Sequence, residues 1–334
     1  MRHVFLTGAA GFVGYHCVRA LLDADYKVTA IDNLNAYYDV ALKKDRLAKI
    51  ENDENFNFIE GDIADHETLN NLADKNPDIE VILHLAAQAG VRYSLENPYS
   101  YGHSNLTGQL AVLELARRLH TQGDLKHCVY ASSSSVYGGN TDYPFSIQDR
   151  VDNPVSLYAA TKKSGEMLAQ SYANLYGIPL TGLRFFTVYG PWGRPDMAYF
   201  LFTKALYEAK TLTLYNNGDM GRDFTYIDDV VSGVQAALDL PPKAGDRGSC
   251  YGATHRIFNL GNNKPVRLSE FLSILEELTG KNARIEYQPM QAGDVKETYA
   301  DIDLSRDLLD FCPETPLRKG LEVFVGWYKA YYKR

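Results

Sequence analysis

The chain has 334 residues, of which 45% are hydrophobic and 23% are charged, a composition typical of globular proteins that excludes disordered, collagen-like and low-complexity classes. Its formal net charge of −8 disfavours binding to nucleic acid or to any other large polyanion. The four cysteines lie far apart without the spacing of a zinc or redox site, and no apolar run is long enough to span a membrane, so we expect a reduced, cytoplasmic protein that holds no metal and binds no membrane.

Short apolar runs and helical patterns alternate over the first 130 residues. We predict strands at residues 3–7, 27–31, 57–60, 81–85 and 127–131, and helices at residues 12–24, 40–51, 67–75 and 101–120. Strict alternation of strand and helix predicts right-handed crossovers between parallel strands. The fold class is therefore α/β, with a Rossmann-type doubly wound parallel sheet that carries helices on both faces.

Beyond residue 131 the alternation continues and then loosens. The remaining predicted elements are a helix at 156–176, a strand at 179–184, and helices at 228–240 and 268–278. We expect the helix at 228–240 to return to the sheet. The first domain is therefore predicted to comprise residues 1–186 together with 226–264, and a smaller C-terminal α/β lobe to comprise residues 187–225 and 265–334.

Three glycines, Gly8, Gly11 and Gly14, directly follow the first predicted strand and open the first predicted helix. In that setting they permit a tight turn, the approach of a pyrophosphate to the backbone, and close packing of helix on sheet. The helix N-terminus adds amide donors for the phosphates. Asp32 ends the second strand, where its carboxylate would bind the adenosine ribose hydroxyls and repel a 2′-phosphate. This predicts an NAD site rather than an NADP site.

Residues that follow other strands complete the predicted cofactor site. Asp62 follows the third strand, where it is placed either to bind the adenine edge or to cap a loop. Small side chains follow the fourth strand and allow the backbone to lie near the cofactor. The other residues that we expect at the dinucleotide are Phe12, Val13, Asn33, Ile63, Leu85, Ala86 and Ala87.

Tyr158 and Lys162 are four residues apart and therefore share one face of the predicted helix. A phenol has an ordinary pKa near 10 and is a poor base at neutral pH. A nearby ammonium and the positive nicotinamide of NAD⁺ would favour the phenolate and lower that pKa. The pair therefore predicts a catalytic base, although a surface tyrosine and an exposed lysine on an amphipathic helix would give the same spacing.

Four consecutive serines, residues 132–135, follow the fifth predicted strand. Ligands of open α/β sheets bind at the carboxyl ends of parallel strands. A hydroxyl at this position can bridge a substrate hydroxyl and the Tyr158 phenol. Chemistry alone does not distinguish which serine acts.

Taken together, these segments resemble the extended short-chain dehydrogenase/reductases that act on nucleotide sugars. The resemblance covers essentially the whole chain, and within it the chain looks most like the UDP-glucuronate 4-epimerases. The segments that carry the family resemblance, beyond those above, are Val136-Tyr137-Gly138, Leu183-Arg184-Phe185-Phe186-Thr187-Val188-Tyr189-Gly190-Pro191, Arg222-Asp223-Phe224-Thr225-Tyr226-Ile227-Asp228-Asp229 and Gly293-Asp294. Those that look most like the UDP-glucuronate 4-epimerases are Pro191-Trp192-Gly193-Arg194-Pro195-Asp196-Met197 and Ala89-Gly90-Val91-Arg92-Tyr93-Ser94.

The resemblance implies roles for individual residues. The catalytic serine of the family would be Ser133, with Ser134 beside the substrate. The diphosphate and nucleoside contacts would be Arg222 and Asp294, although these two residues would equally form a salt bridge between the lobes. Tyr215 would either stack on uracil or pack in the core of the C-terminal lobe.

Arg194 would bind the sugar carboxylate, because a planar guanidinium can hold both carboxylate oxygens. Thr187 would add a hydroxyl, and Arg92 is a weaker candidate for the same carboxylate. An exposed loop arginine, or a structural pair between Arg194 and Asp196, is the alternative.

The implied activity is NAD-dependent epimerisation at C4 of a UDP-sugar, UDP-glucuronate to UDP-galacturonate, through a transient 4-keto intermediate. A UDP-glucuronate decarboxylase is disfavoured because Ser134 and Ser135 stand where many such relatives carry acidic residues. UDP-glucose 4-epimerase and a non-catalytic NAD-binding sensor are further alternatives. Apolar positions on the helices at 101–120 and 156–176 exceed those needed to cover the sheet and, with the resemblance, predict a homodimer.

Overall fold

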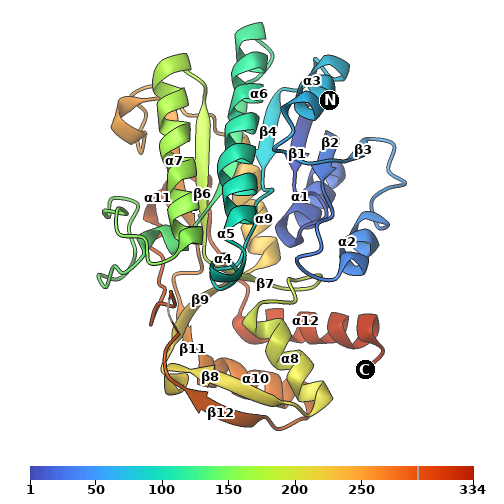
Figure 1. Cartoon of the computed structure of the whole chain (residues 1–334), viewed down its shortest axis with the longest axis vertical. Helices are drawn as coiled ribbons and strands as arrows, with labels where there is room; N and C mark the ends of the chain where they lie inside the picture. Colours follow the sequence, from blue (N-terminus) through green and yellow to red (C-terminus); the bar gives the residue numbers. More distant parts are fainter. Residues whose placement is uncertain (292) are drawn as a thin grey trace.

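A seven-stranded parallel sheet forms the larger part of the computed structural model, which describes residues 1–291 and 293–334 (Figure 1). The strand order is β10-β6-β5-β4-β1-β2-β3, which contains the order that binds dinucleotides in doubly wound sheets. The strands are β1 (His3–Thr7), β2 (Lys27–Asp32), β3 (Phe56–Glu60), β4 (Val81–His84), β5 (His127–Ser133), β6 (Leu180–Phe185) and β10 (His255–Leu260). The predicted doubly wound α/β fold is confirmed.

Helices cover both faces of this sheet. On one face, α6 and α7 lie side by side with α3 beyond α6, and α1 packs against α9 on the other face (Figure 1). Alternate residues of β1 show the consequence: Val4 and Leu6 belong to one buried core and Phe5 to another. The covering helices are α1 (Phe12–Asp23), α3 (His66–Lys75), α6 (Gly108–Gln122), α7 (Leu157–Tyr176) and α9 (Ile227–Leu238).

The segment predicted as one helix over residues 101–120 differs from the prediction. A short helix α5 (Pro98–Tyr101) leads into a π-helical segment, Gly102–Thr107, before α6 begins. The wider turn directs Asn105 inward, where its amide donates to the Gln88 carbonyl (3.0 Å) and its oxygen accepts the Gln88 amide (2.8 Å). The apolar pattern does not record this change, because a single π segment keeps the same face buried.

Elements after β6 build a smaller region next to the carboxyl edge of the sheet (Figure 1). It contains a three-stranded sheet in the order β11-β9-β7 and a parallel pair, β12 and β8. Strands of three to six residues explain why the sequence pattern loosens here. The elements are β7 (Thr187–Tyr189), α8 (Ala198–Glu208), β8 (Thr211–Tyr215), β9 (Gly221–Tyr226), β11 (Pro265–Arg267), α10 (Leu268–Thr279), β12 (Arg284–Gln288) and α12 (Leu317–Tyr332). The short helix α11 (Asp303–Leu309) instead packs against β10 of the large sheet and against α9.

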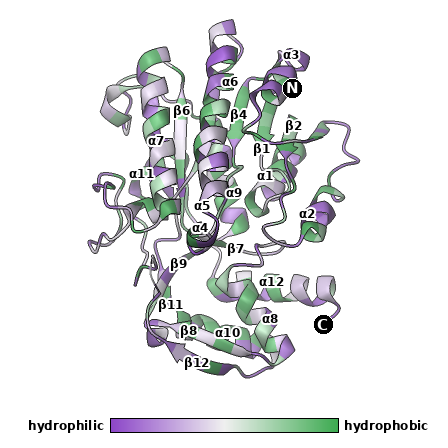
Figure 2. Cartoon of the chain, viewed as in Figure 1, coloured by the Kyte–Doolittle hydropathy of each residue, from purple (hydrophilic) through white to green (hydrophobic). Residues whose placement is uncertain are grey.

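Hydropathy follows this architecture. Figure 2 shows hydrophobic residues concentrated on the central strands of the large sheet, whereas α3 and the outer end of α6 are mostly hydrophilic. No helix in the described part of the chain is long and apolar enough to cross a membrane.

Several histidines are buried in this fold and make fixed hydrogen bonds. His127 donates to the Leu238 carbonyl (3.2 Å) and lies 2.9 Å from the Thr181 hydroxyl. His255 lies 2.8 Å from the Tyr130 hydroxyl. Burial lowers the pKa of His127 and of His255 to about 4, so both stay neutral near pH 6.

We predict that the protein loses stability as the pH falls below about 6.5. His16, His84, His127 and His255 have pKa values lowered to about 4 or about 3 by burial, so the unfolded chain takes up protons that the folded chain does not. Each contributes a fall of up to about 1.4 kcal/mol per pH unit in the free energy of unfolding. Urea unfolding from pH 7.5 to 5 measures this slope, which His127→Gln should flatten. A free energy of unfolding that stays constant over this range would contradict the prediction.

Candidate active site

The carboxyl ends of β1, β2, β4, β5 and β6 border a cavity of about 410 Å³, and residues of the smaller region close its other side. Most of the predicted site residues line this cavity. Those that do are Gly8, Gly11, Phe12, Val13, Gly14, Asp32, Asn33, Ile63, Leu85, Ala86, Ala87, Ser133, Ser134, Tyr158, Lys162, Thr187, Arg194, Arg222 and Asp294. Asp62, Arg92 and Tyr215 are not part of its wall.

The glycine-rich turn after β1 leaves a bare backbone at one end of the cavity. Gly8 has a φ of +81°, and a Cβ there would lie 2.8 Å from the Ala86 nitrogen. A Cβ on Gly14 would lie 2.0 Å from the Gly8 carbonyl oxygen, so the start of α1 packs directly on the turn. No side chain of the described residues caps α1, so the first amides of this helix are available to an anion at this end of the cavity.

Asp32 lies at the end of β2 beside this turn. Its carboxylate accepts hydrogen bonds from the amides of Ala10 (3.1 Å) and Leu34 (2.9 Å). Burial raises the pKa of Asp32, and the nearby Lys43 ammonium opposes that shift. A bare glycine turn, a free helix N-terminus and a carboxylate at the end of β2 together fit a dinucleotide with a ribose hydroxyl pair.

Asp62 has the alternative, loop-capping arrangement. Its carboxylate accepts hydrogen bonds from the Ala64 amide (2.8 Å) and from the Asn33 side chain (3.1 Å). His103 lies 3.2 Å from the same carboxylate. Asp62 therefore supports the loops on which its neighbours Asn33 and Ile63 line the cavity.

Tyr158 and Lys162 lie on α7, which begins where the Ser156 hydroxyl accepts a hydrogen bond from the Ala159 amide (3.1 Å). One turn later, the Lys162 ammonium donates to the Ala131 carbonyl (2.9 Å) and is thereby fixed against the end of β5. Burial lowers the pKa of Lys162 to about 8. Burial also raises the pKa of Tyr158, while the Ser133 hydroxyl and the Arg194 guanidinium favour its phenolate.

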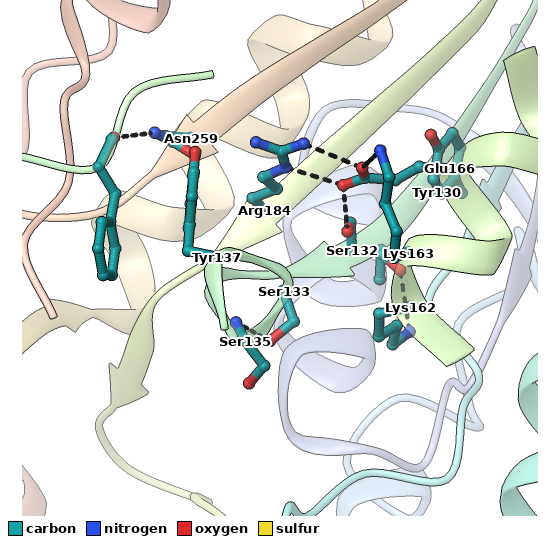
Figure 3. Close-up of polar contacts among 12 residues, drawn as sticks. Tyr130, Ser132, Ser133, Ser135, Tyr137, Lys162, Lys163, Glu166, Arg184 and Asn259 are labelled. Atoms are coloured by element: carbon teal, nitrogen blue, oxygen red, sulfur yellow. Dashed lines mark hydrogen bonds and ion pairs between the residues drawn. The ribbon is translucent and has the colours of Figure 1, made fainter. Parts of the chain in front are cut away.

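A buried ion pair behind these groups was not predicted from the sequence. Arg184 donates through Nε and Nη2 to the two carboxylate oxygens of Glu166, at 2.8 and 2.9 Å (Figure 3). The Lys163 ammonium lies 3.2 Å from Oε2 of the same carboxylate. Ser132 donates to the same carboxylate (2.7 Å). The Ser132 hydroxyl is therefore occupied in the interior, whereas Ser133 faces the opposite side of β5 (Figure 3).

The position of Glu166 in sequence offered a signal for this pair. It follows Lys162 by four residues and so falls on the buried face of α7. A charged residue on a face that packs against the sheet needs a partner, and Arg184 on β6 supplies it.

Residues expected at the sugar nucleotide form two groups. Arg222 donates to the carbonyls of Gly221 (2.7 Å) and Lys296 (3.2 Å), and burial lowers its pKa. Asp294 pairs with Arg92 (2.9 Å), and Arg92 also lies over the Tyr215 ring, 4.4 Å from its centre. The salt bridge considered for Asp294 is thus made with Arg92 rather than with Arg222.

Arg194 both lines the cavity and pairs with Asp196. Its Nε donates to Asp196 Oδ1 (3.1 Å) and its Nη2 to Oδ2 (2.5 Å). The structural pair considered from the sequence is therefore present, and the guanidinium still contributes to the wall that Tyr158 shares. Within residues 1–291 and 293–334, no group of three or more histidine, cysteine, aspartate or glutamate side chains is arranged to hold a metal ion.

Arg46, on α2 (Val40–Leu47), is a further residue that the sequence analysis missed. Its side chain is fully buried and donates to the carbonyls of Ala10 (2.7 Å), Trp192 (2.6 Å) and Gly193 (3.1 Å) and to the Tyr38 hydroxyl (2.8 Å). It joins the glycine turn, the loop after β2 and the loop that carries Arg194. The sequence does contain a signal for its burial, because Arg46 lies on the same face of α2 as the buried leucines of that helix.

Comparison with known proteins gives the class of this fold and site. Residues 4–261 match the NAD dependent epimerase/dehydratase family, and the chain belongs to that family.

Individual relatives have names that are more specific than the family. The chain is 49% identical to UDP-glucuronate 4-epimerase 2 of Arabidopsis thaliana, over 99% of this chain and 76% of that protein. It is 48% identical to Protein CapI of Staphylococcus aureus, over 99% of both chains. UDP-glucuronic acid 4-epimerase from Bacillus cereus, in complex with UDP-glucuronic acid and NAD, superposes with a TM-score of 0.89 at 34% identity, covering 99% of this chain and all of that one.

We predict that Tyr158→Phe leaves the fold and NAD binding intact but lowers turnover of the sugar nucleotide by at least about 10²-fold, the smaller end of what general acid–base catalysis contributes. Tyr99→Phe, at an exposed position on α5, is the matched control. Steady-state turnover and NAD titration of both variants provide the test. Near-normal turnover of Tyr158→Phe would remove Tyr158 from the role of base.

Proposed function

We propose that this protein is a UDP-glucuronate 4-epimerase, which interconverts UDP-glucuronate and UDP-galacturonate with bound NAD. One observation carries the proposal: a guanidinium suited to a carboxylate, that of Arg194, lines the same cavity as the Tyr158 and Lys162 pair. Relatives named UDP-glucuronate 4-epimerase that are 48–50% identical along 98–99% of this chain support it. We keep the division of labour expected from the sequence, with NAD on residues 1–186 and 226–264 and the nucleotide sugar on 187–225 and 265–334.

In this proposal the dinucleotide lies along the carboxyl ends of the strands. The Gly8–Gly14 turn holds its pyrophosphate, Asp32 its adenosine ribose, and Lys162 the end nearest Tyr158. The chemistry that NAD supplies when bound is the reversible removal of a hydride from C4 of the sugar.

Proton transfer at the sugar then rests on this chain's own side chains. Tyr158 takes the proton of the 4-hydroxyl and later returns it, with Ser133 bridging the phenol and the sugar oxygen. The Ser133 hydroxyl and the Arg194 guanidinium favour the phenolate, and we assign the Lys162 ammonium to the same role, because an opposite charge lowers the pKa of an acid. Inversion requires that the 4-keto sugar turn within the cavity before the hydride returns to its other face.

The uronate carboxylate makes this reaction more demanding than epimerisation of a neutral sugar. Oxidation of C4 creates a β-keto acid, which loses CO₂ when the breaking C–C bond aligns with the carbonyl π-system. We assign Arg194 to hold the carboxylate out of that alignment through two hydrogen bonds, with Thr187 as a further donor. Ser134 and Ser135 follow Ser133 in the cavity wall and offer hydroxyls where a competing elimination would use an acid.

Product analysis tests the proposed function. Incubation of the purified protein with UDP-glucuronate should give UDP-galacturonate as the product seen by NMR, without net consumption of NAD. Formation of UDP-xylose would identify a decarboxylase instead, and turnover of UDP-glucose alone would identify a neutral-sugar epimerase. NAD binding without turnover of either sugar nucleotide would identify the protein as a non-catalytic NAD-binding sensor.

We also propose that the enzyme is a homodimer that works in the cytoplasm, where its four free cysteines stay reduced. Apolar side chains are exposed on the neighbouring helices α6 and α7, including Leu110 (42% exposed), Met167 (64%) and Leu175 (68%). Two copies that pair these helices about a two-fold axis would bury them in a four-helix interface.

Sedimentation tests this association. The protein should sediment as a dimer at micromolar concentration, and Met167→Glu should shift it to a monomer because a charge would be buried at the interface. Leu201→Glu, at a similarly exposed position on α8, is the control that should stay dimeric. A monomeric parent protein would contradict the proposal.

A further inference from the structure

Within the described residues, the side-chain hydrogen bonds of Arg194 go to Asp196 and involve one edge of its guanidinium. Nε and Nη2 form the edge that binds Asp196 in a two-point contact. The remaining donors are on Nη1 and on the other side of Nη2, and they form a second edge suited to another planar oxyanion. Pro195 separates Arg194 from Asp196 and restricts the backbone between them. The two-point contact with Asp196 therefore fixes the plane of the guanidinium and, as far as the described residues show, uses only one of its two edges.

Asp196 is itself held from the cofactor side of the cavity. Tyr37, on the loop after β2, donates its hydroxyl hydrogen bond to Asp196 Oδ2 (2.9 Å). The ring of Tyr37 packs on Tyr93, with 4.6 Å between ring centres. Gly90 leaves room for the Tyr37 hydroxyl, since a Cβ at Gly90 would lie 2.4 Å from that oxygen.

The charges of Arg194 and Asp196 keep this arrangement in one protonation state. Arg194 and Asp196 expose only 24% and 27% of their side chains. The Arg194 guanidinium lowers the pKa of Asp196, which stays ionised, while burial and the Asp196 charge raise the pKa of Tyr37, which stays a donor. The three groups thus form one chain of charge-assisted hydrogen bonds at neutral pH.

We propose that Asp196 and Tyr37 are positioning residues that fix the plane of the Arg194 guanidinium, so that its second edge holds the sugar carboxylate in an orientation that resists decarboxylation. This inference rests on the proposed function. Asp196 also neutralises part of the Arg194 charge, so the pair supplies orientation more than attraction. Removal of the Asp196 charge should leave binding of the anionic sugar unweakened and harm the chemical step.

Decarboxylation of the 4-keto intermediate competes with epimerisation, and the share of decarboxylated product is the quantity that the experiment measures. In the 4-keto uronate the bond between C5 and the carboxylate carbon breaks, CO₂ leaves, and the bonding electron pair forms an enolate across C4 and C5. The enolate then takes a proton at C5, which gives a UDP-4-ketopentose with no change in oxidation state beyond the earlier hydride transfer. A loosely held carboxylate reaches the aligned orientation more often, so more of this product is expected.

Three variants test the proposal in the full-length protein with NAD. Asp196→Asn should lower kcat by about 10-fold, as loss of an orienting outer partner often does. It should leave KM for UDP-glucuronate unchanged or lower, and raise the share of decarboxylated product seen by NMR. Tyr37→Phe should shift kcat and product share the same way by a smaller factor, because the Asp196 contact with Arg194 remains.

Asp152→Asn is the matched control. Asp152 pairs with Arg150 at the same two-residue spacing, but at the surface, where the side chains are 61% and 88% exposed. Its kcat, KM and product share should equal those of the parent protein.

The outcomes separate this inference from the proposed function. A parent protein that does not epimerise UDP-glucuronate refutes the function itself. If the parent is active, an Asp196→Asn variant with parental kcat and product share overturns the inference. A raised KM with an unchanged product share overturns it as well, since Asp196 would then serve binding alone. If Asp196→Asn does not bind NAD or does not unfold cooperatively, Tyr37→Phe provides the test. A raised share of decarboxylated product in Tyr37→Phe then supports the inference, and a parental share overturns it.

Discussion

A single buried guanidinium, that of Arg46, joins the parts of the chain that form the site. Its acceptors in the described residues are neutral oxygens from the glycine turn, the loop after β2 and the Trp192–Gly193 segment. Burial of a cation is costly unless its donors are satisfied, so the three segments are favoured only where all of them reach it. Arg46 therefore helps to place the cofactor end and the sugar end of the cavity relative to each other, together with the hydrogen bond from Tyr37 to Asp196.

A second constraint supports the catalytic end of the cavity. The buried pair of Glu166 and Arg184 links α7 to β6, and Ser132 binds the same carboxylate. Such a pair gains little net stability because both charges lose water, but it restricts the arrangement of the elements that carry it. Here those elements present Lys162 and Ser133, so the cost of burial is consistent with a role in fixing geometry.

The site also explains how an acidic protein holds an anionic substrate. The net charge of −8 would repel a sugar nucleotide at long range, whereas Arg194 and Arg222 place cations within the cavity itself. Each is held by oxygen acceptors of the protein, Arg194 by Asp196 and Arg222 by backbone carbonyls. The proposed function therefore assigns recognition to a few fixed donors rather than to a broad positive surface.

The sequence by itself determined the features that depend on local order. The alternation of strand and helix, the three glycines after β1 and the spacing of Tyr158 and Lys162 are set by neighbours in the chain; the structure has the alternation, apart from the π-helical segment before α6, and places these five residues in the wall of one cavity. Only the tertiary structure decided the long-range partners: Asp294 with Arg92, Glu166 with Arg184, and Arg46 with three loops. These contacts join residues 8 to 202 positions apart, and many polar and charged groups compete for each partner until the packed sheet and loops bring particular ones together. Local periodicity carries no information about that choice.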